Sequence, residues 1–268
     1  MDATALGGPN PGPDKPLYSA QRQQAILRTL ATTGRVDVTA MADELSVTGE
    51  TVRKDLIALE RQGQLRRVHG GAIPRQDLSF EPEVTTRVEY AEEKRRIARA
   101  ALAHLPRTGT ILVDAGSTTA RLAELIPPDR HLTAFTNTLP TALVLAGKPN
   151  ITVYTLGGRV RNLTLAEVDS WAARTLSEIN VDVAFLGANG ICIDRGLTTP
   201  DPAEAAVKRL MLGCARRRIL LSDHSKIGQV STHKYGELTD VDLLITDTGI
   251  TGTDDEALRA AGLPMEKT

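Results

Sequence analysis

The sequence has few aromatic side chains, few cysteines and no long apolar run. Aromatic residues make up only 3% of its 268 residues, so its hydrophobic cores must consist mainly of Ala, Val, Leu and Ile. The two cysteines, Cys192 and Cys214, exclude a disulfide framework and suit a reducing compartment. No apolar run reaches about 18 residues and no basic-then-apolar signal pattern opens the chain, so we expect a cytoplasmic protein without a membrane span.

Metal-ligand spacing is missing as well. The five histidines are scattered along the chain and lack the paired spacing of a zinc site, so we expect no metal and no cofactor. The net charge of −1 does not exclude nucleic acid as a partner, because the distribution of charge matters more than its total.

The length predicts two domains, since 268 residues exceed what one small core needs. Residues 7–16 hold seven Gly or Pro in ten positions and cannot bury an apolar face. We therefore expect a disordered tail over residues 1–17. The first domain is predicted over residues 18–74, a linker over 75–91 and the second domain over 92–268.

Three short helices are predicted in the first domain. Ser19 offers an N-cap for a helix that ends at Gly34, and a short extended piece leads into a second helix around residues 41–45. Thr48 can cap a third helix, in which Val52, Leu56 and Leu59 share one face.

A β-ribbon is predicted to follow the third helix. The stretch QLRRVHGGAI (64–73) reads as two short strands joined by a Gly-Gly turn. Three helices and a ribbon in this order predict a winged helix-turn-helix, an α+β domain. Its third helix would enter the major groove of double-stranded DNA, while the ribbon would lie against the phosphate backbone.

Basic side chains gather in this part of the chain. Residues 53–75 hold six basic and two acidic side chains, which can mean a solvated helix face or a phosphate-binding surface. The winged-helix context favours the second interpretation. We expect base contacts from the third helix, phosphate contacts from the ribbon and a turn made by its glycines. The candidate DNA-binding residues are Thr48, Glu50, Thr51, Arg53, Lys54, Arg66, Arg67, His69, Gly70 and Gly71.

The second domain alternates strand-like and helix-like segments. Apolar strands are predicted at TILVDA, LTAFT, ITVYTL, VDVAFLG, RILLSD and VDLLIT, and helices at residues 117–126, 138–147, 165–179 and 202–215. This alternation predicts an α/β domain with a mostly parallel sheet that is covered on both faces. Ligands of such sheets bind beyond the carboxyl ends of the strands.

Polar motifs follow several of these strands. DAGSTT, FTN, LGGRV, GANG and LLSDHSK each place Gly, Asn, hydroxyl or charged residues at a predicted strand end, and DPAEAAVKRLM opens a helix. Each alone is compatible with an ordinary turn or N-cap, and Glu204 with Lys208 could be a surface ion pair. Together they favour an anion site at a helix start, with nearby groups for sugar hydroxyls.

We predict that Ser117, Thr118 and Thr119 hold a phosphate with help from Lys226. The candidate effector-binding residues are Asp114, Gly116, Ser117, Thr118, Thr119, Thr136, Asn137, Gly157, Gly158, Arg159, Asn189, Gly190, Glu204, Lys208, Asp223 and Lys226.

Over nearly its whole length the chain resembles the DeoR family of bacterial transcriptional regulators. The resemblance rests on TVRKDL and RRVHGGA in the first domain, and on DAGSTT, FLGANGI, GLTTPDPAEAAVKR and DHSK in the second. It implies a repressor whose second domain is similar to ribose-5-phosphate isomerase and binds a phosphorylated sugar. Binding of that sugar would release the repressor from its operator. It also implies a homo-oligomer, commonly a dimer or tetramer. Lys54 and Asp169 depart from the family pattern, which more often has Arg and Gly there.

Within the family, the chain looks most like the actinobacterial repressors of fructose operons, whose expected effector is fructose 1-phosphate. The alternatives are a sugar-phosphate isomerase or kinase with an attached DNA-binding module, isomerisation using Glu204 with Lys208 or Lys226, and a non-specific architectural DNA binder. The second alternative would not need the strand-end motifs.

Overall fold

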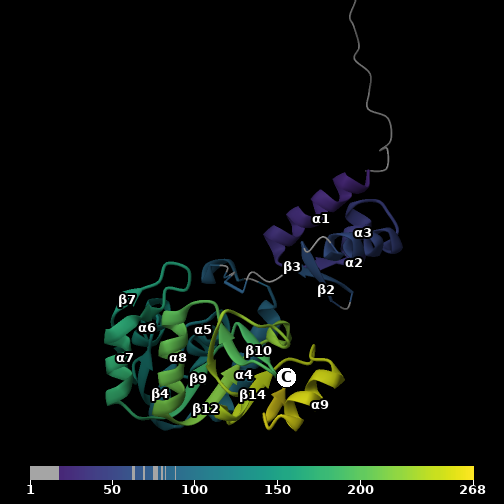
Figure 1. Ribbon diagram of the computed structural model, residues 1–268. Helices are drawn as coiled ribbons and strands as arrows, with labels where there is room; N and C mark the ends of the chain where they lie inside the picture. Colours follow the sequence, from purple (N-terminus) through teal and green to yellow (C-terminus); the bar gives the residue numbers. More distant parts are fainter. Residues whose placement is uncertain are drawn as a thin grey trace, which may run out of the picture. The chain divides into compact units, whose positions relative to one another are not determined.

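The computed structural model describes residues 18–61, 64–68, 70–74, 78, 79, 81, 83–87 and 89–268. It divides into two compact units, Met1–Asp77 and Leu78–Thr268 (Figure 1). The tail expected over residues 1–17 lies outside the described residues. The described residues of the expected linker, from Leu78 onward, belong to the second unit.

The first unit is a winged helix-turn-helix, as predicted. Its three strands form an antiparallel sheet in the order β1-β3-β2. Its elements are α1 (Ser19–Thr33), β1 (Val36–Asp37), α2 (Val38–Glu44), α3 (Gly49–Arg61), β2 (Leu65–Val68) and β3 (Gly71–Pro74).

Local signals fix the ends of these helices. Gly34 terminates α1 with φ of 73° and donates its N–H to Leu30. The carboxylate of Asp37 accepts from the N–H groups of Thr39 and Ala40 and so caps α2. Thr48 accepts the Thr51 N–H at 3.2 Å, in line with the predicted cap of α3. The prediction that Ser19 caps α1 is wrong, because Ser19 is the first helical residue and its hydroxyl donates to Asp55.

A buried ion pair fixes α3 against α1. Val52, Leu56 and Leu59 of α3 are at most 1% exposed and pack in the core of this unit. Asp55 lies beside them, buried, and accepts from Arg22 Nε at 2.7 Å. Asp55, one of the two acidic residues between positions 53 and 75, therefore has a structural role within the unit.

The two glycines after the wing strand β2 have different roles. Gly70 lies in the turn with φ of 76°, which favours glycine. Gly71 is the first residue of β3 and pairs with Asp37, and a Cβ on it would lie 1.9 Å from the Val36 carbonyl oxygen. The expectation that Gly71 belongs to the turn is wrong: it lets β1 and β3 approach closely.

The second unit is built on seven parallel strands. Their order is β15-β14-β12-β9-β4-β5-β6, from β4 (Thr108–Val113), β5 (His131–Thr136), β6 (Ile151–Thr155), β9 (Val181–Leu186), β12 (Ala215–Leu221), β14 (Leu243–Thr246) and β15 (Met265–Lys267). The smaller sheets are β10 (Gly190–Cys192), β11 (Gly196–Thr199) and β13 (His233–Gly236), and the pair β7 (Arg159–Val160) and β8 (Glu167–Val168).

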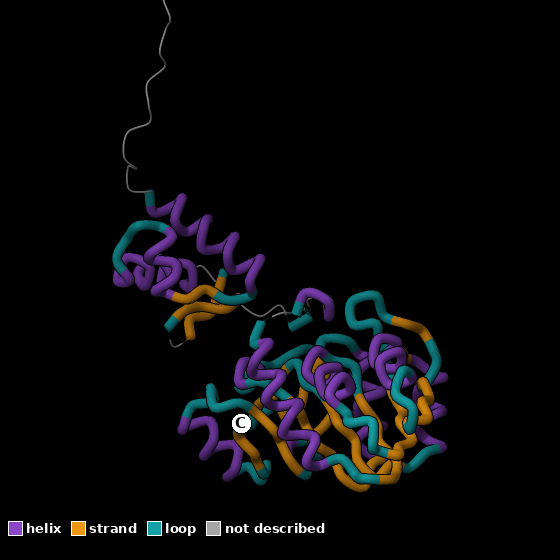
Figure 2. The backbone as a smooth tube through the Cα atoms, turned by 180° about the vertical axis from the view of Figure 1, so that it is seen from behind, coloured by secondary structure: helices purple, strands orange, loops and turns teal. Residues whose placement is uncertain are grey.

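Helices cover both faces of the large sheet (Figure 2). The helices are α4 (Ala91–Ala101), α5 (Ser117–Leu125), α6 (Leu139–Ala146), α7 (Asp169–Glu178), α8 (Pro202–Cys214) and α9 (Gly252–Ala260), with short 3-10 turns η1 (Val84–Thr86), η2 (Leu102–His104), η3 (His224–Lys226) and η4 (Leu238–Asp240). On one face, Ile97 of α4, Leu122 of α5 and Leu145 of α6 pack into the core. On the other face, Leu176 of α7 and Met211 of α8 pack into a second core. The predicted α/β class is confirmed.

The helix expected over residues 165–179 is shorter than predicted. It begins at Asp169, because Glu167 and Val168 form β8 and pair with β7. Asp169 has φ of 74°, a conformation that favours glycine, which explains why the resembling family more often has Gly at this position. Within the described part of the chain, no helix is long and apolar enough to span a membrane.

Candidate functional site

The large sheet reverses its strand order beside β4. β5 and β6 lie on one side of β4, whereas β9, β12, β14 and β15 lie on the other. A parallel sheet opens a crevice at the carboxyl ends of the strands at such a point. Asp114 directly follows β4, and Gly187 directly follows β9, so both lie at this crevice.

A buried lysine–aspartate pair occupies the crevice. Lys208 of α8 is 4% exposed and donates to Asp114 and, at 3.0 Å, to the Gly187 carbonyl oxygen. Asp114 is fully buried and accepts the Gly187 N–H at 3.0 Å through the same carboxylate oxygen. Its other oxygen, Oδ1, has no hydrogen-bond partner among the described residues. A buried acceptor without a partner suits a ligand hydroxyl.

Tyr235 of β13 contacts the same carbonyl oxygen as Lys208. Its hydroxyl donates to the Gly187 carbonyl oxygen at 3.0 Å, and Lys208 Nζ lies 5.5 Å from the centre of its ring. Burial, and then the negative charge of Asp114, raise the pKa of Tyr235 well above its ordinary value. Tyr235 therefore stays a neutral donor at any physiological pH.

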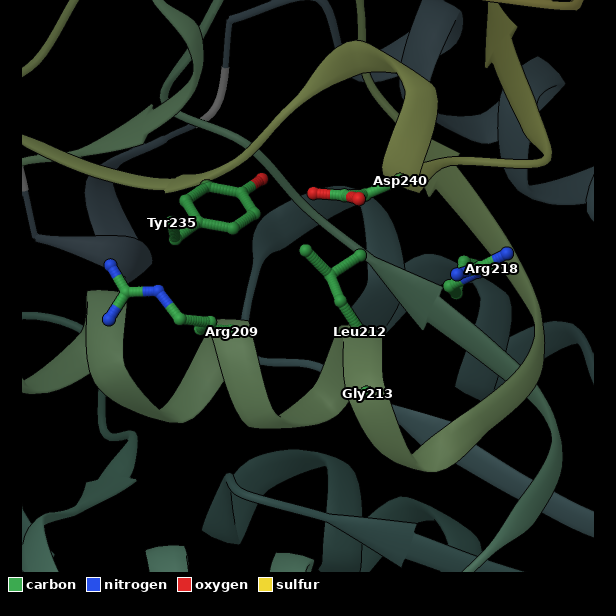
Figure 3. A pocket seen from close by; sticks show the side chains of 6 residues that line it. All are labelled: Arg209, Leu212, Gly213, Arg218, Tyr235 and Asp240. Atoms are coloured by element: carbon green, nitrogen blue, oxygen red, sulfur yellow. The ribbon is translucent and has the colours of Figure 1, made fainter.

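A cavity that Tyr235 also lines is not this site. It has a volume of about 200 Å³ and is lined by Arg209, Leu212, Gly213, Arg218, Tyr235 and Asp240 (Figure 3). Arg218 is engaged with Asp242, and Arg209 donates to the Lys234 carbonyl oxygen. A second hollow, of about 380 Å³, lies at the amino ends of β4, β5 and β6. None of the predicted effector residues lines either.

The start of α5 is open to an anion. No side chain caps this helix, whose N-cap residue is Gly116. Asn137 holds the preceding loop by accepting the Ala115 N–H at 2.8 Å, and Thr119 donates to the Gly116 carbonyl oxygen at 3.0 Å. The first N–H groups of a helix have no partner within it, so the loop presents donors to a phosphate.

Arg161, which the sequence did not single out, gathers three carboxylates beside Lys208. Its side chain is 11% exposed and contacts Glu81 at 2.9 Å, Asp201 at 3.2 Å and Glu204. Burial alone would lower the pKa of Arg161, but the charges and hydrogen bonds of Glu204 and Glu81 outweigh it, and the pKa is raised. The ion pair considered between Glu204 and Lys208 is absent from the described structure: Glu204 binds Arg161 and Thr164, and Lys208 binds Asp114.

Glu81 reaches this cluster from the segment between the two sequence-predicted domains. Its carboxylate is 1% exposed and accepts from Arg161, from Arg87 at 3.0 Å and from the Asn189 amide at 3.4 Å. The segment is anchored on either side, because the Thr232 N–H donates to Leu78 and the Val84 N–H donates to Leu163. We call residues 78–90 the arm.

A third group of charges lies at the end of the arm. Lys94 is buried and donates to the carbonyl oxygens of Arg87 and Glu89. Burial lowers the pKa of Lys94, and the nearby charge of Asp223 partly opposes this. Asp223 also accepts from Ser225 and caps η3, which carries Lys226. Two predicted residues, Asp223 and Lys226, thus lie near one another and near Lys94.

Several predicted effector residues have structural roles instead. Thr136 is buried and donates to the Val113 carbonyl oxygen at 2.7 Å. The Arg159 side chain is 59% exposed and pairs with Asp169. A Cβ on Gly158 would lie 2.3 Å from the Val168 carbonyl oxygen, and one on Gly190 would lie 2.5 Å from that of Gln229. Gly157 donates its N–H to Glu167. These residues shape loops around the crevice and place no polar side chain in it.

In the first unit, α3 presents an exposed polar face. The side chains of Glu50 and Arg53 are 65% and 60% exposed and form a loose pair at 3.5 Å, and Lys54 is exposed beside them. The Thr51 hydroxyl contacts that of Thr48 at 2.9 Å. These side chains can reorient toward a DNA groove because burial does not hold them.

One of the two arginines of the wing, Arg67, is ion-paired with Glu60. Arg67 donates through Nε to Glu60 at 2.6 Å and through its backbone N–H at 2.8 Å, while Arg66 is exposed. The hydrogen bond from the Arg67 side chain, followed by that from its N–H, lowers the pKa of Glu60. His69 lies outside the described residues. In the described part of the chain, no group of three His, Cys, Asp or Glu side chains could hold a metal.

Two family models match the chain. The DeoR-like helix-turn-helix domain matches residues 22–76, and the DeoR C-terminal sensor domain matches residues 89–248. The HTH-type transcriptional regulator GlpR of Haloferax volcanii is 33% identical over 250 residues, covering 93% of this chain and 98% of that protein. A putative aga operon transcriptional repressor of Escherichia coli O157:H7 is 30% identical over 250 residues, covering 92% and 93%.

Among solved structures, ribose 5-phosphate isomerase A from Neisseria gonorrhoeae matches with a TM-score of 0.37 and 19% identity, covering 52% of this chain and 53% of that one. So distant a similarity says nothing about activity. The relatives are named as regulators, which removes the isomerase alternative. With both domain models matched in order and relatives aligned along nearly its whole length, the chain belongs to the DeoR family of transcriptional regulators and is not an enzyme.

Proposed function

We propose that the chain is a repressor of sugar-metabolism genes that binds a double-stranded operator and is released by a phosphorylated sugar. The observation that carries the effector half of this proposal is the crevice beside β4. It brings the open start of α5 together with a buried carboxylate, Asp114, that has one oxygen without a partner among the described residues. A phosphate and a hydroxyl-bearing body are the two parts that such a site accommodates.

In the proposed complex, the N–H groups at Ser117 and Thr118 bind the phosphate. Asp114 and Lys208 contact hydroxyls of the sugar from the opposite side of the crevice. Lys226 adds positive charge from η3. The best candidate effector is fructose 1-phosphate, which rests on the resemblance to repressors of fructose operons.

For the DNA half, α3 supplies Arg53, Lys54, Glu50 and Thr51 to the base edges, and Arg66, Arg67 and His69 of the wing contact phosphates. Base contacts specify the site and phosphate contacts position the protein. Arg53→Ala is expected to cost about 1–3 kcal/mol of binding free energy and to relax discrimination at one base step. A binding selection from random DNA, repeated with the variant, measures both effects; unchanged site preference would remove Arg53 from the base contacts.

A thermal-shift panel tests the effector half. Phosphorylated sugars, beginning with fructose 1-phosphate, are compared with their unphosphorylated parents. A ligand at 100 times its dissociation constant stabilises the native state by about 2.7 kcal/mol, which corresponds to a shift of several degrees. We expect a shift from one phosphosugar and none from its parent. Equal shifts from both would contradict the phosphate site.

The variant Thr118→Glu tests the position of the phosphate. Thr118 lies in the first turn of α5 and is 7% exposed. A carboxylate there would repel the phosphate, so the variant should bind operator but resist release by the effector. Thr141→Glu would be a poor control because Thr141 is buried too. The preferred control is Thr253→Glu, at an exposed position in the first turn of α9. Normal induction of Thr118→Glu would exclude this loop.

We also propose that the chain works as a homo-oligomer. Large apolar side chains are exposed on neighbouring elements of the second unit: Leu143 on α6 at 76%, Tyr154 on the edge strand β6 at 52%, and Trp171 on α7 at 73%. Exposed apolar side chains of this size around the β6 edge of the sheet favour a protein–protein contact. Sedimentation of the full chain and of a Leu143→Arg variant tests this, and an identical monomer mass for both would contradict it.

A further inference from the structure

The arm places a carboxylate where the crevice binds ligands. Glu81 is 1% exposed in its side chain, although most of its neighbours in the arm, such as Glu83 and Glu89, are exposed. It accepts from Arg161 at 2.9 Å and from Asn189 at 3.4 Å. These two partners come from loops outside the arm, whereas a third, Arg87 at 3.0 Å, belongs to the arm.

The Glu81 cluster adjoins the Asp114–Lys208 pair. Glu204, which shares Arg161 with Glu81, lies one helical turn before Lys208 on α8, and such residues are about 5–6 Å apart. Asn189 lies two residues after Gly187, whose carbonyl oxygen accepts from Lys208. A ligand held by Asp114 and Lys208 therefore extends directly toward the groups that hold Glu81.

Arg161 would keep its position if Glu81 left. Asp201 contacts its Nε at 3.2 Å and Glu204 contacts its Nη1, so two carboxylates orient the guanidinium independently of the arm. Asp201 is itself fixed, because it caps α8 through the N–H groups of Ala203 and Glu204. The donors that Glu81 occupies are thus preorganised for another oxygen.

The charges also make Glu81 the replaceable member. Three carboxylates, of Glu81, Asp201 and Glu204, face the two guanidiniums of Arg87 and Arg161. Arg87 lies on the arm and pairs with Glu81, so the two leave together and Arg161 keeps the carboxylates of Asp201 and Glu204. A buried cluster with one excess negative charge holds that carboxylate less firmly than a balanced one.

We infer that Glu81 is a built-in competitor of the effector, and that oxygen atoms of the bound sugar phosphate replace its carboxylate on Arg161 and Asn189. This inference rests on the proposed function and names how the site is regulated. The arm follows the wing directly in sequence, since β3 ends at Pro74 and Glu81 is seven residues later. Displacing Glu81 frees the segment that leads from the effector site to the DNA-binding domain, which supplies the two states that an effector must distinguish.

The variant Glu81→Gln tests the inference, with Glu83→Gln as the matched control from the exposed part of the arm. Hydrogen exchange is followed at the Val84 N–H, which donates to Leu163 at 2.7 Å, in the full chain. Without ligand, Glu81→Gln should exchange faster there, while Glu83→Gln should match the wild type. Adding fructose 1-phosphate, or another sugar phosphate active in the panel, should speed the exchange of the wild-type protein toward that of Glu81→Gln.

Effector affinity gives the second readout. An internal competitor lowers apparent affinity by the fraction of molecules in which the site is free, so Glu81→Gln should bind the sugar phosphate about tenfold more tightly than the wild type. Glu81→Ala should behave similarly, which guards against a special property of the amide. Equal affinity in wild type and both Glu81 variants, or unchanged Val84 exchange, would overturn the inference while the proposed function stands. Binding of no sugar phosphate to any of the proteins would overturn both.

Discussion

The two units treat charged side chains differently. On α3 of the DNA-binding unit, Arg53 and Glu50 are more than half exposed and only loosely paired at 3.5 Å. In the sensor unit, the side chains of Arg161 and Lys208 are 11% and 5% exposed, and each is bound to buried carboxylates. Exposed ion pairs contribute at most about 1 kcal/mol to stability, so they break readily when DNA phosphates compete for the cation. Buried pairs are tied to the fold, and only a ligand that reproduces their contacts can replace a partner.

The difference teaches where specificity for each partner comes from. A DNA surface has to exchange its counterions for a long polyanion, which suits mobile cations. A small-molecule site has to distinguish one sugar phosphate from others, which suits fixed donors and acceptors with few alternatives. The four predictions below test whether burial, and not membership of one unit or the other, sets these properties.

The largest effect is expected from Lys208→Met. It leaves Asp114, fully buried, without its cation, and an uncompensated buried charge costs about 3–5 kcal/mol. Chemical unfolding of the full chain, followed in the sensor unit, measures the loss. Lys54→Met, an exposed lysine of α3, is the control and should change stability by less than about 0.5 kcal/mol. Equal losses of stability in both variants would show that burial does not determine the cost. Recovery of stability in the double variant Asp114→Asn/Lys208→Met would attribute the loss to the unpaired charge of Asp114.

The architecture could be predicted because it depends on local patterns. Apolar runs such as those of β5 and β9 mark buried parallel strands, and the spacing of Val52, Leu56 and Leu59 marks the buried face of α3. The small strands β10, β11 and β13 were not predicted, because all three are short and because β13 pairs with β11 across a long stretch of sequence, Thr198 with Lys234.

The site could be predicted only in part, for the same reason. Asp114, Lys208 and the α5 start stand at strand ends or in helical spacing, which the sequence displays. Arg161 meets Glu81 across 80 residues and Glu204 across 43, and no local pattern carries such pairings. Glu81 lies in a segment without periodicity, which predicted a linker. Nothing local in that segment indicates that its carboxylate is buried.

The second effect concerns the buried ion pair of the DNA-binding unit. Asp55 accepts from Arg22 at 2.7 Å and from the Ser19 hydroxyl at 3.0 Å, and its side chain is 5% exposed. Asp55→Asn should therefore destabilise this unit by about 2 kcal/mol, although it removes a negative charge from a DNA-binding domain. Thermal unfolding of the full chain resolves this if the unit melts separately. A variant more stable than the wild type would show that exposure and burial do not divide the charges as argued.

The third effect depends on pH. Burial alone would raise the pKa of Asp247, but hydrogen bonds from the N–H groups of His224 and Gly249 and from the His224 ring outweigh it and hold the pKa below its ordinary value. A depressed carboxylate pKa stabilises the fold above the unfolded pKa, and the contribution is lost as pH falls through the folded pKa. Asp247→Asn should thus be about 1 kcal/mol less stable at pH 7, with the difference shrinking below about pH 4.

Unfolding of Asp247→Asn and wild type between pH 3 and 7 measures this trend. A gap between Asp247→Asn and wild type that stays constant down to pH 3 would mean that the carboxylate charge makes no contribution.

The smallest effect on stability is expected from Glu60→Gln, where the effect on DNA binding is informative. Glu60 accepts from Arg67 at 2.6 Å, and both side chains are exposed by a third or more. Losing this pair should hardly change unfolding, but it frees Arg67 for a phosphate. Binding should strengthen, and the plot of log K against log salt should steepen by about 0.9 for one additional phosphate contact. Arg67→Ala should flatten it by a similar amount if Arg67 already contacts DNA. If neither variant changes the slope, Arg67 stabilises the wing and does not contact DNA phosphates. Exposure alone would then not make a charged side chain available to DNA.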